Sequence, residues 1–432
     1  MSFWPLVKWL KLPLHFFVNQ FNHLNTHFKF MKLKLQSEFG SLNTVITHRP
    51  GHEIERLTPY NTSELLFEDV PYLEVMQKEH DVFTSLIRQT GAEVLRLHDL
   101  LVDVLLDEKI LVDLFKHEFT DHKLGHRAEE IIERYSTAEC ANILVAGLRV
   151  KELKRKYNCK ELDDKGENEY LIQPSPNQYF MRDPAAVVQT GVINSSMKFP
   201  SRQRESNLVR IIFENHPKFK GAYHRIYPEN GQAHSIEGGD VIVLSDHALA
   251  IGNSERTDRK AIEEVARQVM KEGNVQRVYE VDLPPKRNFM HLDTVFTMID
   301  ENLIVTYPDA MDSILRTSVW HADGKDEKGN LQLKEERVNE SIISILKKEI
   351  PYLEVIETGA GNPDFASREQ WYDGANVFAV GPRRVISYNR NKFTNRALRE
   401  IGVEVLEIPS SELSRGLGGP RCMTMPVDRN DH

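Results

Sequence analysis

The sequence contains very little cysteine, with three residues, at positions 140, 159 and 422, in a chain of 432. They lie too far apart for a disulfide framework, and no CxxC pair is present to suggest a thiolate zinc site. So few cysteines fit a reducing compartment, and we therefore expect a cytoplasmic protein.

Long apolar runs and an excess of positive charge are also missing. No run of eighteen uncharged apolar residues occurs, so we expect no membrane span. The 55 Lys and Arg residues are outnumbered by 64 Asp and Glu, which gives a net charge of −9. Nucleic-acid binding needs a basic face, so we expect no nucleic-acid partner. A hydrophobic fraction of 40% is enough for a large globular core.

The first 34 residues differ from the rest of the chain. Their aromatic and apolar letters are interrupted by Lys8, Lys11 and prolines, and no small-residue cleavage site follows, which argues against a signal peptide. An amphipathic segment on a membrane surface is the alternative. We expect residues 1–34 to be a disordered or lightly docked extension, most of which a translation start at Met31 would remove.

From residue 35 onward, short runs rich in Val and Ile alternate with helical patterns. Three close pairs have hairpin spacing, in DVIVLSDHALAIG (240–252), VFTMIDENLIVTY (295–307) and VFAVGPRRVISY (377–388). A helix and a further short strand follow each pair. This recurring unit predicts a ring of small sheets. A single doubly wound parallel sheet is the alternative, and the hairpins argue against it.

Between residues 106 and 170 the strand pattern is replaced by helical spacing, as in Ile131, Ile132 and Tyr135. We therefore expect a helical insertion at 106–170 within an α/β body formed by 35–105 and 171–432.

Four stretches place acids, a histidine and a thiol beside turns. They are NQYFMRDP (177–184), EGGD (237–240), HLD (291–293) and GGPRC (418–422). If HLD is extended, His291 and Asp293 point to the same face, where the carboxylate would raise the pKa of the imidazole. A His and an Asp in a solvated turn are the alternative.

Cys422 stands apart from the other two cysteines. Cys140 lies in an apolar helix and is expected in the core, and Cys159 is expected at the surface. Cys422 follows two glycines, in a loop that does not suit a core side chain. This loop thiol lies beside Arg421 and, we expect, near a histidine. We therefore expect it to be held as the reactive thiolate.

Together these stretches resemble the arginine deiminases, of the guanidino-group-modifying superfamily. The similarity begins near SEFGSLNTVITHRPGHEIERLTP (37–59) and continues through FMRDPA, IEGGDVIVL, IGNSERT, MHLDTVFTMID, REQWYDGAN, YNRN and GGPRCMTMP. The resemblance implies a pentein-like α/β fold, a pseudo-fivefold ββαβ propeller with an inserted helical domain. It also implies a hydrolase of arginine catabolism that converts L-arginine to L-citrulline and ammonia without metal or organic cofactor.

The resemblance assigns roles to five catalytic residues. Cys422 would attack the guanidinium carbon and form a covalent thiouronium intermediate. Asp183 and Asp293 would hold the guanidinium nitrogens. His291 would protonate the leaving ammonia and then activate water, supported by Glu237.

The resemblance also implies a substrate-binding set. Arg202 and Arg256 would clamp the α-carboxylate, with Arg204 as an alternative to Arg202. The other members are Asn177, Phe180 and Asp240. Leu417 stands where some members of the family have an arginine in a closing loop, and the tail VDRNDH also departs from the family pattern.

Several other functions remain open at this point. The substrate could be agmatine or a methylated arginine, or the cysteine could transfer an amidino group to an amine. A non-catalytic arginine-binding protein would keep the same fold, and a metal-dependent hydrolase would use His291, Asp293 and Asp240. A homo-oligomer is compatible with the sequence.

Overall fold

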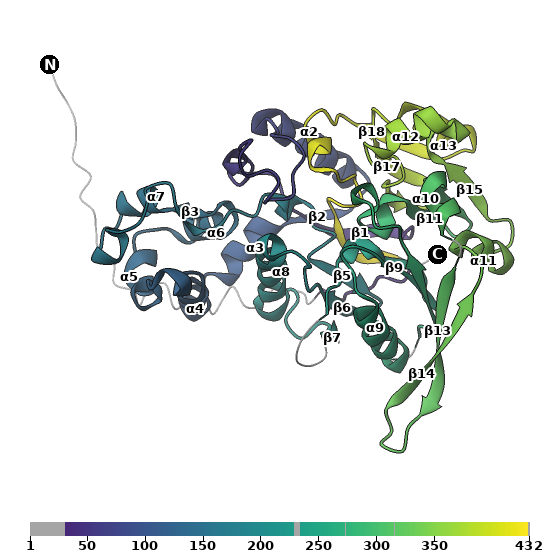
Figure 1. Cartoon of the computed structure of the whole chain (residues 1–432), viewed down its shortest axis with the longest axis horizontal. Helices are drawn as coiled ribbons and strands as arrows, with labels where there is room; N and C mark the ends of the chain where they lie inside the picture. Colours follow the sequence, from purple (N-terminus) through teal and green to yellow (C-terminus); the bar gives the residue numbers. More distant parts are fainter. Residues whose placement is uncertain (1–30, 229–233, 273, 315, 431–432) are drawn as a thin grey trace.

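The computed structural model describes residues 31–228, 234–272, 274–314 and 316–430 (Figure 1). The expected N-terminal extension therefore lies almost wholly outside the described residues. Its last few residues border the body of the molecule, since Lys34 bridges to Asp428 and the next residue, Leu35, bridges to Gln189.

Five sets of three strands share one plan, in which an antiparallel pair is followed by a third strand parallel to the second. The first set is β19 (Met425–Asn430), β1 (Ser41–Thr47) and β2 (Glu93–Arg96); the second is β5 (Ala185–Val188), β6 (Gly191–Asn194) and β7 (His224–Tyr227); the third is β8 (Val241–Ser245), β9 (Ala248–Asn253) and β10 (Arg277–Asp282); the fourth is β11 (Phe296–Asp300), β12 (Leu303–Thr306) and β15 (Glu354–Glu357); the fifth is β16 (Phe378–Gly381), β17 (Arg384–Tyr388) and β18 (Glu404–Ile408).

A helix connects the second and third strands of every set. These helices are α2 (Leu73–Gln89), α8 (Gln203–Asn215), α9 (Arg259–Glu272), α11 (Ile342–Glu349) and α13 (Lys392–Glu400). In α9, Ala261, Val265 and Val269 are buried, as their spacing of four predicts. The five ββαβ units confirm the predicted pseudo-fivefold α/β fold, and the doubly wound sheet is wrong.

The ring closes through the two ends of the described chain. β19 pairs with β1 in antiparallel register from Ser41 opposite Asn430 to Ile46 opposite Met425. A hairpin of β13 (Thr317–Lys325) and β14 (Leu331–Val338) extends the third sheet beyond β10 and projects from the body in Figure 1. Two further helices, α10 (Pro308–Ser313) and α12 (Pro363–Gln370), belong to the fourth unit and the connection after it.

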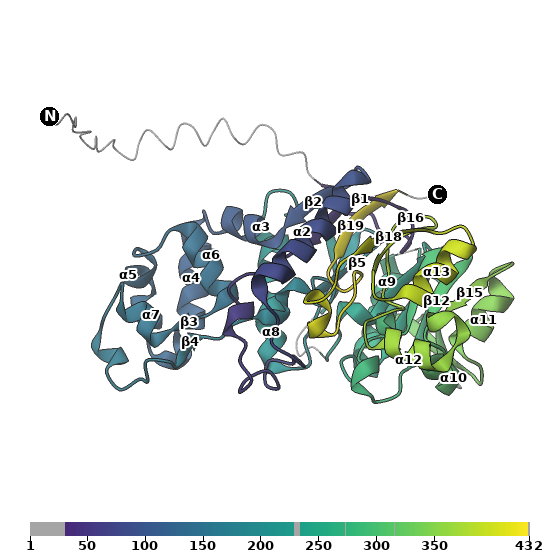
Figure 2. The ribbon, with the colours of Figure 1, turned by 90° about the horizontal axis from the view of Figure 1, so that it is seen from above.

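A group of helices follows β2 and lies to one side of the sheets in both ribbon views (Figures 1 and 2). It comprises α3 (Leu97–Val104), α4 (Glu108–Glu118), α5 (Ala128–Ile132), α6 (Thr137–Ala146) and α7 (Val150–Lys154), with the short strands β3 (Leu148–Arg149) and β4 (Tyr170–Ile172). One hydrophobic cluster runs from these helices into β5, β6 and β8. The division into an insertion at 106–170 and a body at 35–105 and 171–432 remains our proposal.

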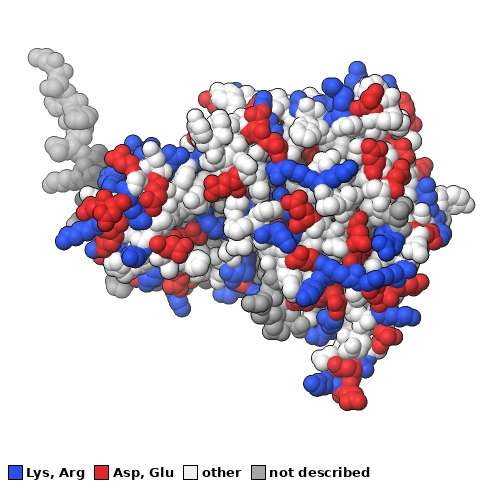
Figure 3. All heavy atoms as spheres, viewed as in Figure 1, with Lys and Arg blue, Asp and Glu red and all other residues white. Residues whose placement is uncertain are grey.

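Among the described residues, no helix combines the length and the apolar character that crossing a membrane requires. Acidic and basic side chains are interspersed over the face shown in Figure 3. That face therefore presents no continuous basic surface of the kind that binds nucleic acid.

Candidate active site

The expected catalytic residues lie just before the first strands of different units. Asp183 precedes β5, Glu237 precedes β8, and Cys422 precedes β19. His291 and Asp293 precede β11, where Leu292–Thr294 forms a 3-10 turn. Because equivalent edges of the five units meet at the centre of the ring, residues more than 200 positions apart converge on one small cavity.

This central cavity has a free volume of about 20 Å³, which is room for roughly one water molecule. Its lining includes seven residues predicted from the sequence, namely Asn177, Phe180, Asp183, Arg202, Arg256, His291 and Cys422. Glu237 and Asp293 contact lining residues, as described below. Leu66, Met290, Thr294, Gly416 and Leu417 complete the lining.

His291 is buried between two carboxylates. Its Nε2 lies 2.9 Å from Oε2 of Glu237, and its Nδ1 lies 3.6 Å from Oδ1 of Asp183. Burial alone would lower the pKa of His291, but the two acids outweigh it and raise the pKa to about 9. The imidazole is therefore protonated at neutral pH and able to donate a proton.

The HLD segment is not extended throughout, so the condition for placing His291 and Asp293 on one face of a strand is not met. His291 has extended dihedral angles, but the chain then turns in the 3-10 conformation. Asp240 holds this turn by accepting a hydrogen bond of 2.9 Å from the backbone N–H of Leu292, and it also accepts from Ser254 and Thr257. Burial raises the pKa of Asp240 to about 6. Asp240 does not line the cavity, so it acts on the site through the turn.

Both arginines of the expected carboxylate clamp face acids of the site. Arg202 Nη1 lies 2.8 Å from Asp183 Oδ2, and Arg256 Nη1 lies 3.3 Å from Glu237 Oε2. Glu205 fixes Arg202 from behind, through two contacts to one carboxylate oxygen. Arg204, the alternative to Arg202, does not line the cavity.

Cys422 is buried, with 4% of its surface exposed, so the expectation that its loop does not suit a core side chain is wrong. Its Sγ lies 3.6 Å from Oδ2 of Asp293. Burial, together with the charges of Asp293 and Asp183, raises the pKa of Cys422 well above its usual value. Arg421 does not offset this, because its guanidinium is itself buried and bound to Asp293 at 2.7 Å and to Glu38 at 3.0 Å. The expected thiolate therefore requires a further cation. Cys140 is buried as predicted, and Cys159 is partly buried.

Asn376 is a site residue that the sequence analysis missed. Its side-chain oxygen accepts a 3.0 Å hydrogen bond from the backbone N–H of Cys422, and its Nδ2 donates at 3.0 Å to the carbonyl of Asp293. It precedes β16, the position in the fifth unit that corresponds to the catalytic positions of the other four. A polar residue directly before the hairpin VFAVGPRRVISY was the signal that could have identified it.

Two carboxylate oxygens in the site are buried without a hydrogen bond among the described residues. They are Oδ1 of Asp183 and Oδ1 of Asp293. Each is an acceptor whose burial is unfavourable until a donor reaches it. The site thus offers two oriented acceptors beside a thiol and a protonated imidazole.

Three residues of the site could also serve as ligands of a metal ion. Asp183, Glu237 and His291 can bring one ligand atom each within 4.8 Å of one another. However, Arg202 and Arg256 already contact these acids, and the imidazole is held in its cationic form. This donor set fits a cationic organic group better than a metal ion, because a metal would displace both arginines and the imidazole proton.

Comparison with known proteins gives one consistent family. A family model described as arginine deiminase matches residues 63–429. The arginine deiminase of Limosilactobacillus reuteri is 40% identical over 420 residues, covering 92% of this chain and 98% of that protein. The arginine deiminase of Oenococcus oeni is 38% identical over 410 residues, with the same coverage.

Solved structures with a similar fold share less sequence. DDAH from Pseudomonas aeruginosa, complexed with citrulline, superposes with a TM-score of 0.51 at 15% identity, covering 89% of this chain and 99% of that one. The amidinotransferase SxtG from Microseira wollei gives a TM-score of 0.55 at 14% identity, covering 93% and 98%. These likenesses support the fold alone. With a family match over most of its length and relatives at 38–40% identity, the chain belongs to the arginine deiminase family.

Proposed function

We propose that the central cavity hydrolyses L-arginine to L-citrulline and ammonia, with Cys422 as the nucleophile. The observation that supports this most directly is that two buried carboxylate oxygens beside the thiol, Oδ1 of Asp183 and Oδ1 of Asp293, accept no hydrogen bond from the described residues. A guanidinium is planar and carries a fork of N–H donors, so two oriented carboxylates fix both its position and its plane. Its carbon is then presented to Sγ of Cys422.

The arriving guanidinium also supplies the cation that the thiol lacks. Its charge counters the acids that raise the pKa of Cys422, and so favours the thiolate in the complex. The thiolate attacks the guanidinium carbon to form a tetrahedral adduct. Collapse of this adduct breaks a C–N bond, and His291 gives its proton to the departing ammonia, which leaves a thiouronium on Cys422.

Hydrolysis reverses the role of the imidazole. Neutral His291 accepts a proton from water, and the hydroxide adds to the thiouronium carbon. The adduct then loses the proton of its hydroxyl to the solvent as the C–S bond breaks, which releases L-citrulline and regenerates the thiolate. Glu237, at 2.9 Å, stabilises the imidazolium in each cycle.

The far end of the substrate would be held by arginine side chains. Arg256 and Arg202 line the cavity, so each could meet an α-carboxylate. Asp183 must exchange its contact with Arg202 for the substrate guanidinium, and the small cavity must widen to admit an amino acid. Agmatine has no carboxylate and would leave the arginines without that partner, so it should be a poor substrate. A cytoplasmic location and a homo-oligomeric state remain predictions.

The decisive experiment measures citrulline and ammonia from L-arginine, with agmatine assayed in parallel. We expect turnover of L-arginine alone, abolished in Cys422→Ser, while Cys140→Ser retains activity as the matched control. Ornithine in place of citrulline would indicate transfer of an amidino group. A folded wild-type protein that produces neither product would contradict the assignment.

A further inference from the structure

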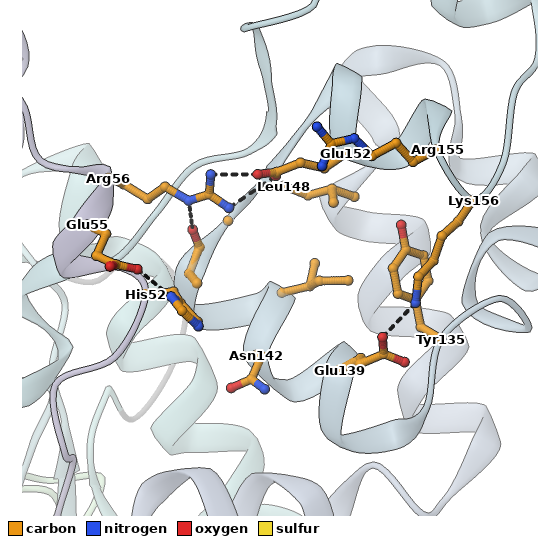
Figure 4. Close-up of a pocket in the computed structure, with 13 residues that line it drawn as sticks. His52, Glu55, Arg56, Tyr135, Glu139, Asn142, Leu148, Glu152, Arg155 and Lys156 are labelled. Atoms are coloured by element: carbon orange, nitrogen blue, oxygen red, sulfur yellow. Dashed lines mark hydrogen bonds and ion pairs between the residues drawn. The ribbon is translucent and has the colours of Figure 1, made fainter.

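A second, much larger cavity lies between the helices after β2 and the turn that follows β1 (Figure 4). Its volume is about 500 Å³, within the range typical of small-molecule sites. One wall comes from the 3-10 turn Ile54–Arg56 and its neighbour His52. The opposite wall comes from residues 135–156. We call this space the seam cavity.

Charged side chains surround the seam cavity, and nearly all of them are paired. Three pairs line it, namely His52 with Glu55, Arg56 with Glu152, and Lys156 with Glu139. Arg155 is the exception, since its exposed side chain makes neither an ion pair nor a hydrogen bond within the described residues. The cavity therefore has one guanidinium that no carboxylate contacts, while the lining as a whole holds three Arg and Lys residues and three Glu residues.

Uncharged polar groups add donors to the same lining. The hydroxyl of Tyr135 is buried and has no hydrogen-bond partner among the described residues, although a buried hydroxyl normally has one. Lys156 lies over its ring at 4.3 Å and fixes it in place. Asn142 also lines the cavity, and Ile143 and Leu148 give the lining an apolar strip.

We propose that the seam cavity binds a small organic monoanion, a carboxylate attached to a short apolar body. The single unpaired guanidinium of Arg155 matches one carboxylate, because the two groups form parallel charge-assisted hydrogen bonds. The apolar strip accommodates the body, and the hydroxyl of Tyr135 supplies a further donor. A multiply charged phosphate would fit less well, since the other cations are already paired with glutamates.

Both walls of the seam cavity continue into the active site. From the first wall, the carbonyl of Arg56 accepts a 3.0 Å hydrogen bond from Asn61, whose own carbonyl accepts from the N–H of Leu65. From the second wall, the carbonyl of Val145 accepts at 2.9 Å from the N–H of Ser175, two residues before Asn177.

The two paths meet where Asn177 donates a 2.7 Å hydrogen bond to the carbonyl of Leu65. Asn177 and the next residue along the first path, Leu66, both line the catalytic cavity. A ligand that contacts both walls of the seam cavity therefore acts, through these hydrogen bonds, on the bond between Asn177 and Leu65. We infer that such a ligand changes the KM for L-arginine.

The test titrates 4-methylpentanoate into the full-length protein by calorimetry, with 4-methylpentanamide as the uncharged control. We expect saturable binding of the acid alone, weakened at least about tenfold in Arg155→Gln, because a charge-assisted interaction is lost. Arg134→Gln is the matched control, since it removes the same charge from a neighbouring exposed residue outside the lining. Its affinity should equal that of the wild type.

A second variant probes the hydroxyl. Tyr135→Phe should weaken binding several-fold without lowering the melting temperature, because none of the residues that the structure describes hydrogen-bonds to this hydroxyl. Absence of saturable binding, or equal binding by Arg155→Gln and wild type, would overturn the site. Binding that leaves the KM for L-arginine unchanged would overturn its link to Asn177. The titration needs no turnover, so it is independent of the proposed catalytic roles.

Discussion

Replacing Asn376 by alanine tests whether this residue positions the nucleophile. The substitution removes two buried hydrogen bonds of 3.0 Å. It leaves the N–H of Cys422 without a partner among the described residues, whereas the carbonyl of Asp293 keeps a longer hydrogen bond of 3.4 Å from the hydroxyl of Thr297. The unpaired N–H costs about 1–3 kcal/mol and the second lost hydrogen bond costs about 1 kcal/mol, so the free energy of unfolding should fall by about 2–4 kcal/mol. A displacement of Cys422 by about 1 Å should in addition lower kcat roughly a hundredfold.

The assay combines urea unfolding with the kinetics of citrulline formation. Asn395→Ala is the matched control, because Asn395 is also fully buried and donates two hydrogen bonds, to the carbonyl of Tyr388 and to Glu407, but lies on α13 outside the cavity lining. We expect both variants to lose stability and only Asn376→Ala to lose kcat. If kcat falls equally in both, or in neither, the positioning role of Asn376 is refuted.

Three further predictions concern pH, the cavity wall and metal ions. Asp183 and Glu237 outweigh the effect of burial and raise the pKa of His291 from 6.5 to about 9. The charge of His291 therefore stabilises the folded state fully below pH 6.5, and this stabilisation is lost as the pH rises through about 9. The melting-temperature advantage of wild type over His291→Gln should shrink across that window, and a constant advantage would contradict the assigned charge. Leu417 has a φ of 55°, which costs a leucine about 1–2 kcal/mol. Leu417→Gly relieves this strain but also removes the side chain from the cavity lining, so the free energy of unfolding should change by less than about 1 kcal/mol while the KM for L-arginine rises. An unchanged KM would show that the side chain does not contact substrate. Activity should survive dialysis against EDTA, since arginines already neutralise the acids beside His291, and activity restored only by a divalent ion would refute this.

The repeating architecture could be predicted from the sequence because its strand pairs are local. Hairpins such as 240–252 and 377–388 carry their own turn residues, and the helix after each carries its own apolar spacing. β19 was missed because its letters, MPVDRN, have little strand character. Its conformation depends on pairing with β1 at the other end of the chain, and no local pattern records such a contact.

The identities of the site residues were predictable from motifs, but their electrostatic state was not. Arg421 beside Cys422 in the sequence suggested a thiolate, yet its guanidinium is directed to Glu38 and Asp293. Neighbours in sequence need not interact in space, and a pKa is set by burial and by all surrounding charges together. Asn376 escaped notice because an amide before a strand has no distinctive pattern until the five units are superposed.

The closing of the ring by β19 determines when during folding the site is completed. Cys422 lies three residues before Met425, and β19 pairs with a strand almost 390 positions earlier in the chain. Contacts of such sequence separation carry the greatest loop-closure cost and tend to slow folding. The helices and hairpins can form from their neighbours alone, but the thiol meets Asp293 and Asn376 only once the last strand has docked. Regain of activity during refolding should therefore report completion of the ring, later than the regain of helical circular dichroism.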